Sequence, residues 1–119
     1  MDKITLFHNL VNLAAVDNQF SEEEIRFLIN RADRWGIPNE EFEIALVGIR
    51  EGNYELQIPD STADRRMMLE EMIRLMAVDG HLAPQEKDFC ARASSRMDFT
   101  NQEFQQLVDD LIKPDHLAK

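Results

Sequence analysis

Two stretches of the sequence decide the fold: LAAVDNQFSEEEIRF at residues 13–27 and LMAVDGHLAPQEKDF at residues 75–89. In each stretch an apolar run with helical spacing stops at an aspartate, and a glutamate stands seven residues further on. Ser21 and Glu24 have the spacing of a capping box, which starts a helix, and Pro84 suits the first position of a helix. Each stretch therefore predicts two helices joined by a short turn.

The two stretches belong to a longer internal repeat. With a shift of 62 residues, residues 13–46 and 75–108 share ten identities in 34 positions without a gap. We therefore predict two copies of a three-helix unit, a first copy at residues 7–50 and a second copy at residues 69–112, packed about a pseudo-two-fold axis. Neither copy alone would bury its apolar face, so we expect residues 1–119 to form a single domain.

Helical periodicity runs through most of the chain, and no alternating strand pattern appears. We therefore expect an all-α fold. Gly36 is a natural helix terminator, and Thr100 with Glu103 forms a second capping box. The expected helices cover residues 3–17, 21–36, 39–51, 61–78, 84–97 and a last segment from 100 to just before 114.

The repeat also predicts which side chains fill the core. A methionine stripe with spacing i, i+4, i+8 is expected to be ordinary core filling rather than a binding face: Met68, Met72 and Met76. Cys90 is expected to be buried, because it aligns with the core position of Leu28. Four aromatic residues occupy equivalent positions and are expected to anchor the core: Phe27 with Phe89, and Phe42 with Phe104.

The composition indicates the cellular compartment in which we expect the protein. One cysteine excludes an internal disulfide framework and fits a reducing compartment. No apolar run approaches the roughly 18 residues of a membrane span, and the N-terminus has no secretory pattern. We therefore expect a cytoplasmic protein without direct membrane insertion.

The formal net charge of −10, from 23 acidic and 13 basic residues, narrows the choice of partners. A nucleic-acid binder normally presents a basic stripe to phosphates, and no such stripe occurs in the sequence. Cations or basic partner surfaces are the natural counterparts of an acidic protein. Nucleic acid is therefore excluded as an expected partner.

The aspartates at the ends of the apolar runs, Asp17 and Asp79, are open to two interpretations. A carboxylate at the C-terminal end of a helix faces the negative end of the helix dipole, so its presence in both copies needs compensation. Each aspartate can form the turn itself. Alternatively, the pseudo-two-fold axis brings both turns together, and Asp17, Glu24, Asp79 and Glu86 hold a divalent cation. Calcium or magnesium comes first, because the ligands are hard oxygens.

The second turn is not an EF-hand, although DGHLAPQE at residues 79–86 matches the back half of an EF-hand loop. The first and third ligand positions of such a loop would be Leu75 and Ala77, which have no side-chain oxygen. The two quoted stretches and their helical spacing instead resemble the TerB-like domain of bacterial tellurite-resistance proteins, over nearly the whole chain. The first copy differs from the family pattern at Asn18, which replaces a glycine, and the second at Ala83, which replaces a capping residue.

This resemblance implies an all-helical fold, an acidic metal site, and protein partners in membrane-associated stress-response complexes. An enzyme is the least supported class, because His8, His81 and His116 match no metal or triad spacing; a carboxylate–metal hydrolase is the weakest alternative. A metal-binding module predicts that the four carboxylates converge. A protein–protein interaction domain without metal predicts an exposed apolar groove, near the methionine stripe or GNYELQIP at residues 52–59.

Overall fold

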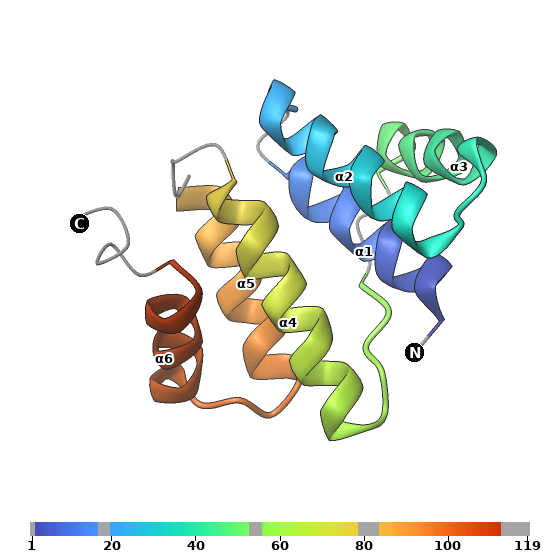
Figure 1. Ribbon diagram of the computed structural model, residues 1–119. Helices are drawn as coiled ribbons and strands as arrows, with labels where there is room; N and C mark the ends of the chain where they lie inside the picture. The colour runs from blue at the N-terminus through green and yellow to red at the C-terminus, as the bar shows by residue number, and fades with distance from the viewer. Residues whose placement is uncertain (1, 17–19, 53–55, 79–83, 113–119) are drawn as a thin grey trace.

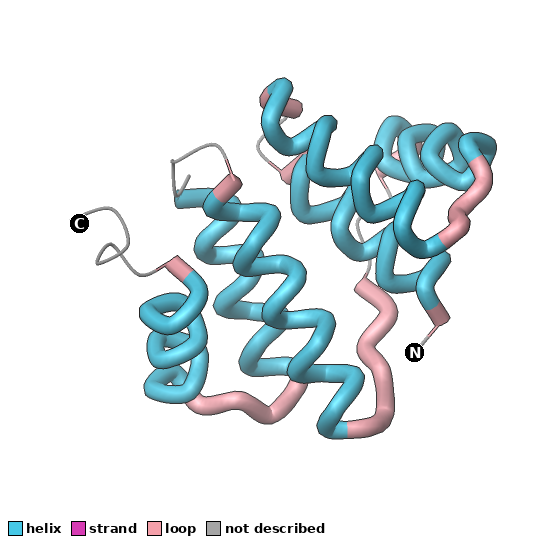
Figure 2. The backbone as a smooth tube through the Cα atoms, viewed as in Figure 1, coloured by secondary structure: helices cyan, strands magenta, loops and turns pink. Residues whose placement is uncertain are grey.

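The computed structural model describes residues 2–16, 20–52, 56–78 and 84–112, and within these ranges it contains helices and no strand. Figures 1 and 2 show the helices packed against one another, with a long connection leading into α4. The all-α prediction is confirmed for these residues. The helices are α1 (Lys3–Ala14), α2 (Glu22–Trp35), α3 (Asn39–Arg50), α4 (Thr62–Ala77), α5 (Pro84–Arg96) and α6 (Asn101–Leu111).

The predicted helix starts are confirmed by their caps. The Ser21 hydroxyl accepts the N–H of Glu24, and the Glu24 carboxylate accepts the N–H of Ser21, both at 3.0 Å. Thr100 and Glu103 form the same reciprocal pair at the start of α6. Each pair satisfies two N–H groups that the first turn of a helix leaves without a backbone acceptor.

The predicted end of the first helix was wrong. The sequence indicated a helix over residues 3–17, but α1 ends at Ala14. The next residues turn more tightly, because the N–H of Val16 donates to the carbonyl of Leu13, three residues back, at 3.2 Å. The other predicted ends lie within about two residues of the observed ones, which is the ordinary uncertainty of helix ends.

Helices α2 and α5 end in the same way, 62 residues apart. Gly36 and Asp98 both hold a φ of 67°. The N–H of Ile37 donates to the carbonyl of Ala32 at 2.8 Å, and the N–H of Phe99 donates to Ser94 at 3.0 Å. A left-handed residue followed by this backward bond is a Schellman motif, which satisfies carbonyls that the last turn leaves open. Gly36 is thus confirmed as the terminator of α2.

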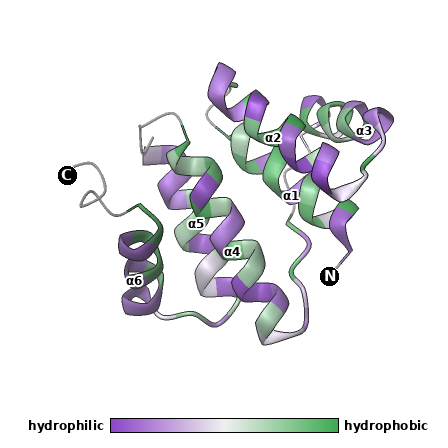
Figure 3. Cartoon of the chain, in the orientation of Figure 1, coloured by the Kyte–Doolittle hydropathy of each residue, from purple (hydrophilic) through white to green (hydrophobic). Residues whose placement is uncertain are grey.

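Helices α1 and α4 form the centre of the molecule. α1 packs against α2, α3, α4 and α5, and α4 packs against α1, α2, α5 and α6. The three stripe methionines are fully buried, which confirms that they fill the core. Figure 3 shows hydrophilic colours on the side of α6 that turns away from its neighbours; its apolar side packs Phe104, Leu107 and Val108 inward.

The aromatic anchors are less deeply buried than the repeat predicted. Of the four equivalent phenylalanines, Phe104 is buried, whereas Phe27, Phe42 and Phe89 are half-buried and pack against the core from its edge. Phe42 contacts the fully buried Phe7 edge to face, with ring centroids 5.8 Å apart. The four phenylalanines therefore occupy equivalent positions in the two sequence copies but are not buried to the same degree.

Candidate functional site

Two of the four predicted metal ligands lie within the described residues. Glu24 is in the first turn of α2 and Glu86 is in the first turn of α5, and their exposed fractions are 3% and 2%. Figure 1 draws the N-terminal ends of α2 and α5 at the same, upper end of the molecule. Asp17 and Asp79, the other two predicted ligands, lie outside the described residues, as does His81.

Glu24 already has a structural role, since its carboxylate closes the capping box with Ser21. Glu86 lies one turn before Cys90, which is fully buried as predicted. Burial, and secondarily the charge of Glu86, raise the pKa of the Cys90 thiol far above its usual range. A buried thiol of this kind behaves as a small apolar side chain and not as a nucleophile.

No metal centre is assembled by the described part of the chain alone. Among residues 2–16, 20–52, 56–78 and 84–112, no three His, Cys, Asp or Glu side chains come together in a way that could hold a metal ion. His8 lies 3.0 Å from Glu41 through its Nε2 atom, as a pair between α1 and α3. The site formed by Asp17, Glu24, Asp79 and Glu86 therefore stays a prediction.

A concave feature of the described surface lies between α2 and α3. Both helices pack on α1, but they make little or no direct contact with each other, whereas α5 and α6 pack together. The resulting groove holds about 200 Å³. We call it the α2–α3 groove; its lining residues are Phe7, Ile29, Ala32, Asp33, Gly36, Ile37, Pro38, Asn39 and Phe42.

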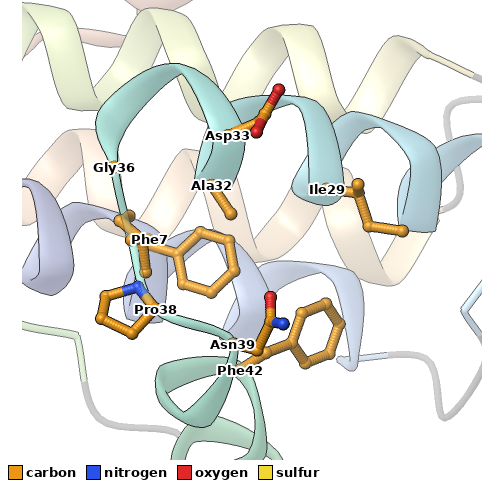
Figure 4. A pocket seen from close by; sticks show the side chains of 9 residues that line it. Phe7, Ile29, Ala32, Asp33, Gly36, Pro38, Asn39 and Phe42 are labelled. Atoms are coloured by element: carbon orange, nitrogen blue, oxygen red, sulfur yellow. The ribbon is translucent and has the colours of Figure 1, made fainter.

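Figure 4 shows how the groove is built. Phe7 from α1 and Phe42 from α3 lie below α2, and Ile29 and Ala32 come from α2 itself. The connection through Gly36 closes one end, because its left-handed conformation turns the chain sharply from α2 toward α3. Asp33 contributes the one titratable side chain among these lining residues. The groove is thus lined mostly by apolar residues, with Asn39 and Asp33 as the polar ones, and Figure 4 shows the Asp33 carboxylate directed outward from α2, away from Phe7 and Phe42.

Exposed aliphatic side chains gather on the first copy. Ile29 at the groove is 57% exposed, and Ile44 on the outer side of α3 is 53% exposed. Four exposed residues of this copy correspond by sequence to mostly polar ones in the second: Ile25 with Lys87, Ile29 with Ala91, Ile44 with Gln106, and Val47 with Asp109. Since equivalent helices form without these side chains, helix formation does not account for them.

The alternative of a protein–protein interaction domain predicted an apolar groove near the methionine stripe or residues 52–59, and sequence reasoning missed the α2–α3 groove. The methionines are buried, so that location was wrong for the stripe; residues 53–55 lie outside the described part of the chain. The signal was nevertheless in the repeat, because Ile29 stands where the second copy has the small residue Ala91.

Comparison with protein-family models, with curated proteins and with solved structures found no match for this chain. The resemblance to TerB-like domains therefore rests on the two quoted stretches alone. No described helix is long and apolar enough to cross a membrane.

Proposed function

We propose that the chain is a non-enzymatic helical module that binds a helix of a partner protein in the α2–α3 groove. The observation that carries this proposal is Ile29, an aliphatic side chain left largely exposed beside a groove that is lined mostly by apolar residues. Grooves of this kind receive the apolar face of an amphipathic helix through a few aliphatic anchors. The single titratable lining residue, Asp33, offers no acid–base pair for catalysis.

The groove can supply useful binding energy. Complete burial of an isoleucine side chain is worth about 1.5–3 kcal/mol. Because 57% of Ile29 is still exposed, covering it would add roughly 1–1.5 kcal/mol. The half-buried Phe42 adds further apolar area on the opposite side. A few such anchors are what a modest-affinity helix site requires.

The proposal includes the pseudo-two-fold arrangement of the two copies. Helices α2 and α5 begin 62 residues apart, as do α3 and α6. The Schellman bonds at the ends of α2 and α5 have the same spacing. The contact of α1 with α5 also corresponds to the contact of α4 with α2. In this arrangement the groove is a feature of the first copy, because α5 and α6 pack together at the equivalent place.

Peptide binding tests the function. Three fluorescent helical peptides of about 15 residues carry leucine on one face and glutamine, lysine or glutamate on the other. We expect fluorescence anisotropy to detect binding that weakens about fivefold in Ile29→Ala. Ile44→Gln, on the same copy but outside the groove, is the control and should bind as wild type. If no peptide distinguishes wild type from Ile29→Ala, the proposal is wrong.

A second candidate function is binding of a divalent cation at the acidic turns. It is favoured by the equivalent first-turn positions of Glu24 and Glu86, whose carboxylate oxygens are the hard ligands that calcium and magnesium take. Bound calcium or magnesium should raise the melting temperature by mass action. Asp79→Asn/Glu86→Gln should abolish that rise. Identical melting temperatures with and without about millimolar metal would leave the aspartates as turn formers.

The resemblance to TerB-like domains adds a setting for either function. It would place the module in stress-response complexes, including those of tellurite resistance, where a binding domain without catalysis is expected. A groove for a partner helix and a cation at the turns are compatible in one molecule, because the groove lies at the α2–α3 connection and the turns lie at the start of α2 and α5.

A further inference from the structure

We infer that the helix bound in the α2–α3 groove is basic, with lysine or arginine flanking its aliphatic anchor. This inference rests on the proposed function and specifies the chemistry of its partner. It comes from two exposed acidic side chains, Asp33 on α2, which lines the groove, and Glu43 on α3, which lies one helical turn beyond the lining residue Asn39.

Helix geometry places both carboxylates beside the groove. Asp33 lines it and follows Ile29 by four residues, and Glu43 follows the lining residue Asn39 by four residues. Residues four apart lie on the same helix face. Asp33 and Glu43 are both exposed, and no Lys, Arg or His of the described chain lies within ion-pair distance of either carboxylate.

Asp33 is also poorly placed for the stability of its own helix. It lies near the C-terminal end of α2, two residues before Trp35, where the helix dipole disfavours a negative charge. The equivalent residue in α5 is Ser95, and the equivalent of Glu43 in α6 is Gln105. The second copy thus forms these helices with neutral residues at both positions. The two carboxylates, like Ile29, occur in the first copy and not at the equivalent positions of the second.

The negative charge of the protein favours a basic helix in the groove over a second molecule of this chain. Another molecule of this chain would bring a net charge of −10 to a surface that is itself acidic, so self-association in the groove is disfavoured by repulsion. A helix with an aliphatic face and basic flanks would cover Ile29 while its cations meet Asp33 and Glu43. Such complementary charges raise the rate of encounter and set specificity more than they raise affinity alone.

The three leucine-face peptides test this inference when their affinities are compared. At low salt the lysine peptide should bind at least about tenfold more tightly than the glutamine peptide, and the glutamate peptide most weakly. Raising the ionic strength from about 20 to about 300 mM should shrink the difference, because salt screens exposed charges. A lysine peptide that binds no more tightly than the glutamine peptide overturns the inference.

Two double variants test whether Asp33 and Glu43 attract the lysine peptide. Asp33→Ser/Glu43→Gln introduces the residues that the second copy carries, and it should weaken binding of the lysine peptide about three- to tenfold. Asp109→Asn/Asp110→Asn removes the same charge from exposed positions of α6 and should bind as wild type. Equal losses in both variants would mean attraction to the net charge and overturn the inference. Circular dichroism checks that each variant is folded.

The outcomes separate the inference from the proposed function. If all three peptides bind equally and Ile29→Ala weakens each of them, the groove is a helix site without charge preference, and only the inference fails. If none responds to Ile29→Ala, both fail. Sedimentation velocity of the protein alone should show a monomer; dimers that Ile29→Ala abolishes would place another molecule of this chain in the groove and overturn the inference.

Discussion

Replacing Arg31 by methionine should lower the free energy of unfolding by about 2–3 kcal/mol, because it breaks an ion pair between the two copies. Arg31 on α2 bonds to Glu71 on α4, with Nε 2.5 Å from Oε1 and Nη2 3.4 Å from Oε2. The side chains are 13% and 8% exposed. Without Arg31, the buried carboxylate of Glu71 keeps Arg74 as a cationic partner, at 2.7 Å.

The magnitude follows from what remains after the substitution. Removing one partner of a fully buried pair costs about 3–5 kcal/mol, and the remaining bond from the partly exposed Arg74 lowers that figure. Methionine retains much of the apolar stem of Arg31, whose guanidinium carbon lies 4.2 Å from the centre of the Phe27 ring. Most of the loss should therefore come from the charge left behind.

The assay is urea unfolding followed by helical circular dichroism, with a matched control on the same helix. Arg26→Met removes the exposed pair with Glu22 and should cost less than about 0.5 kcal/mol. Arg31→Met/Glu71→Leu removes the buried carboxylate of this pair together with its partner, and stability should return to within about 1 kcal/mol of wild type. Equal losses for Arg31→Met and Arg26→Met would refute the reasoning, since the burial of the pair would then have no energetic effect.

Four further outcomes are expected. Asp98→Gly should change stability in urea by less than about 0.5 kcal/mol, because relief of strain at a φ of 67° is offset by loss of the exposed ion pair with Arg65. Gly36→Ala should lower stability by about 1 kcal/mol, because alanine is strained at the φ of 67° that Gly36 holds. Cys90 should resist iodoacetamide at about pH 8 in the native protein and react after denaturation, as mass spectrometry would show, because it is buried. Phe104→Ala should cost about 3–4 kcal/mol and the half-buried Phe27→Ala clearly less, in the same urea assay.

The predictable part of the fold was local. Capping at Ser21 and Thr100 depends on residues three positions apart, and termination at Gly36 depends on a single conformational preference. These signals are contained in a short window of sequence, so they place helix ends well. The error at the end of α1 arose where apolar spacing continued through Val16 while the backbone had already tightened into a turn.

The part that escaped prediction depends on distant contacts. The Arg31–Glu71 pair joins residues 40 positions apart, and the groove exists because two helices that follow each other in sequence both pack on a third and make little or no contact with each other. Periodicity marks which face of a helix is apolar, but it does not say how much of that face a neighbour covers. Ile29 looks like a core residue by spacing and is more than half exposed.

The predicted acidic site also has a part that depends on local sequence and a part that depends on distant contacts. Sequence spacing placed Glu24 and Glu86 correctly in the first turns of α2 and α5. Whether four carboxylates meet depends on two turns that contain Asp17 and Asp79, outside the described residues. Comparison between the copies was the more informative use of the repeat. Ile29 has a large aliphatic side chain where the second copy has Ala91, so helix formation alone does not require the large side chain at this position.

The central claim, that the α2–α3 groove of the first copy is the binding surface, is tested most directly by two-dimensional ¹⁵N–¹H NMR during titration with the lysine peptide. The account predicts shift changes confined to the amides around the groove, including Ile29, Gly36, Asn39 and Phe42, and their loss in Ile29→Ala. Unchanged groove amides at saturating peptide, or equal changes at the equivalent positions of α5 and α6, would contradict it.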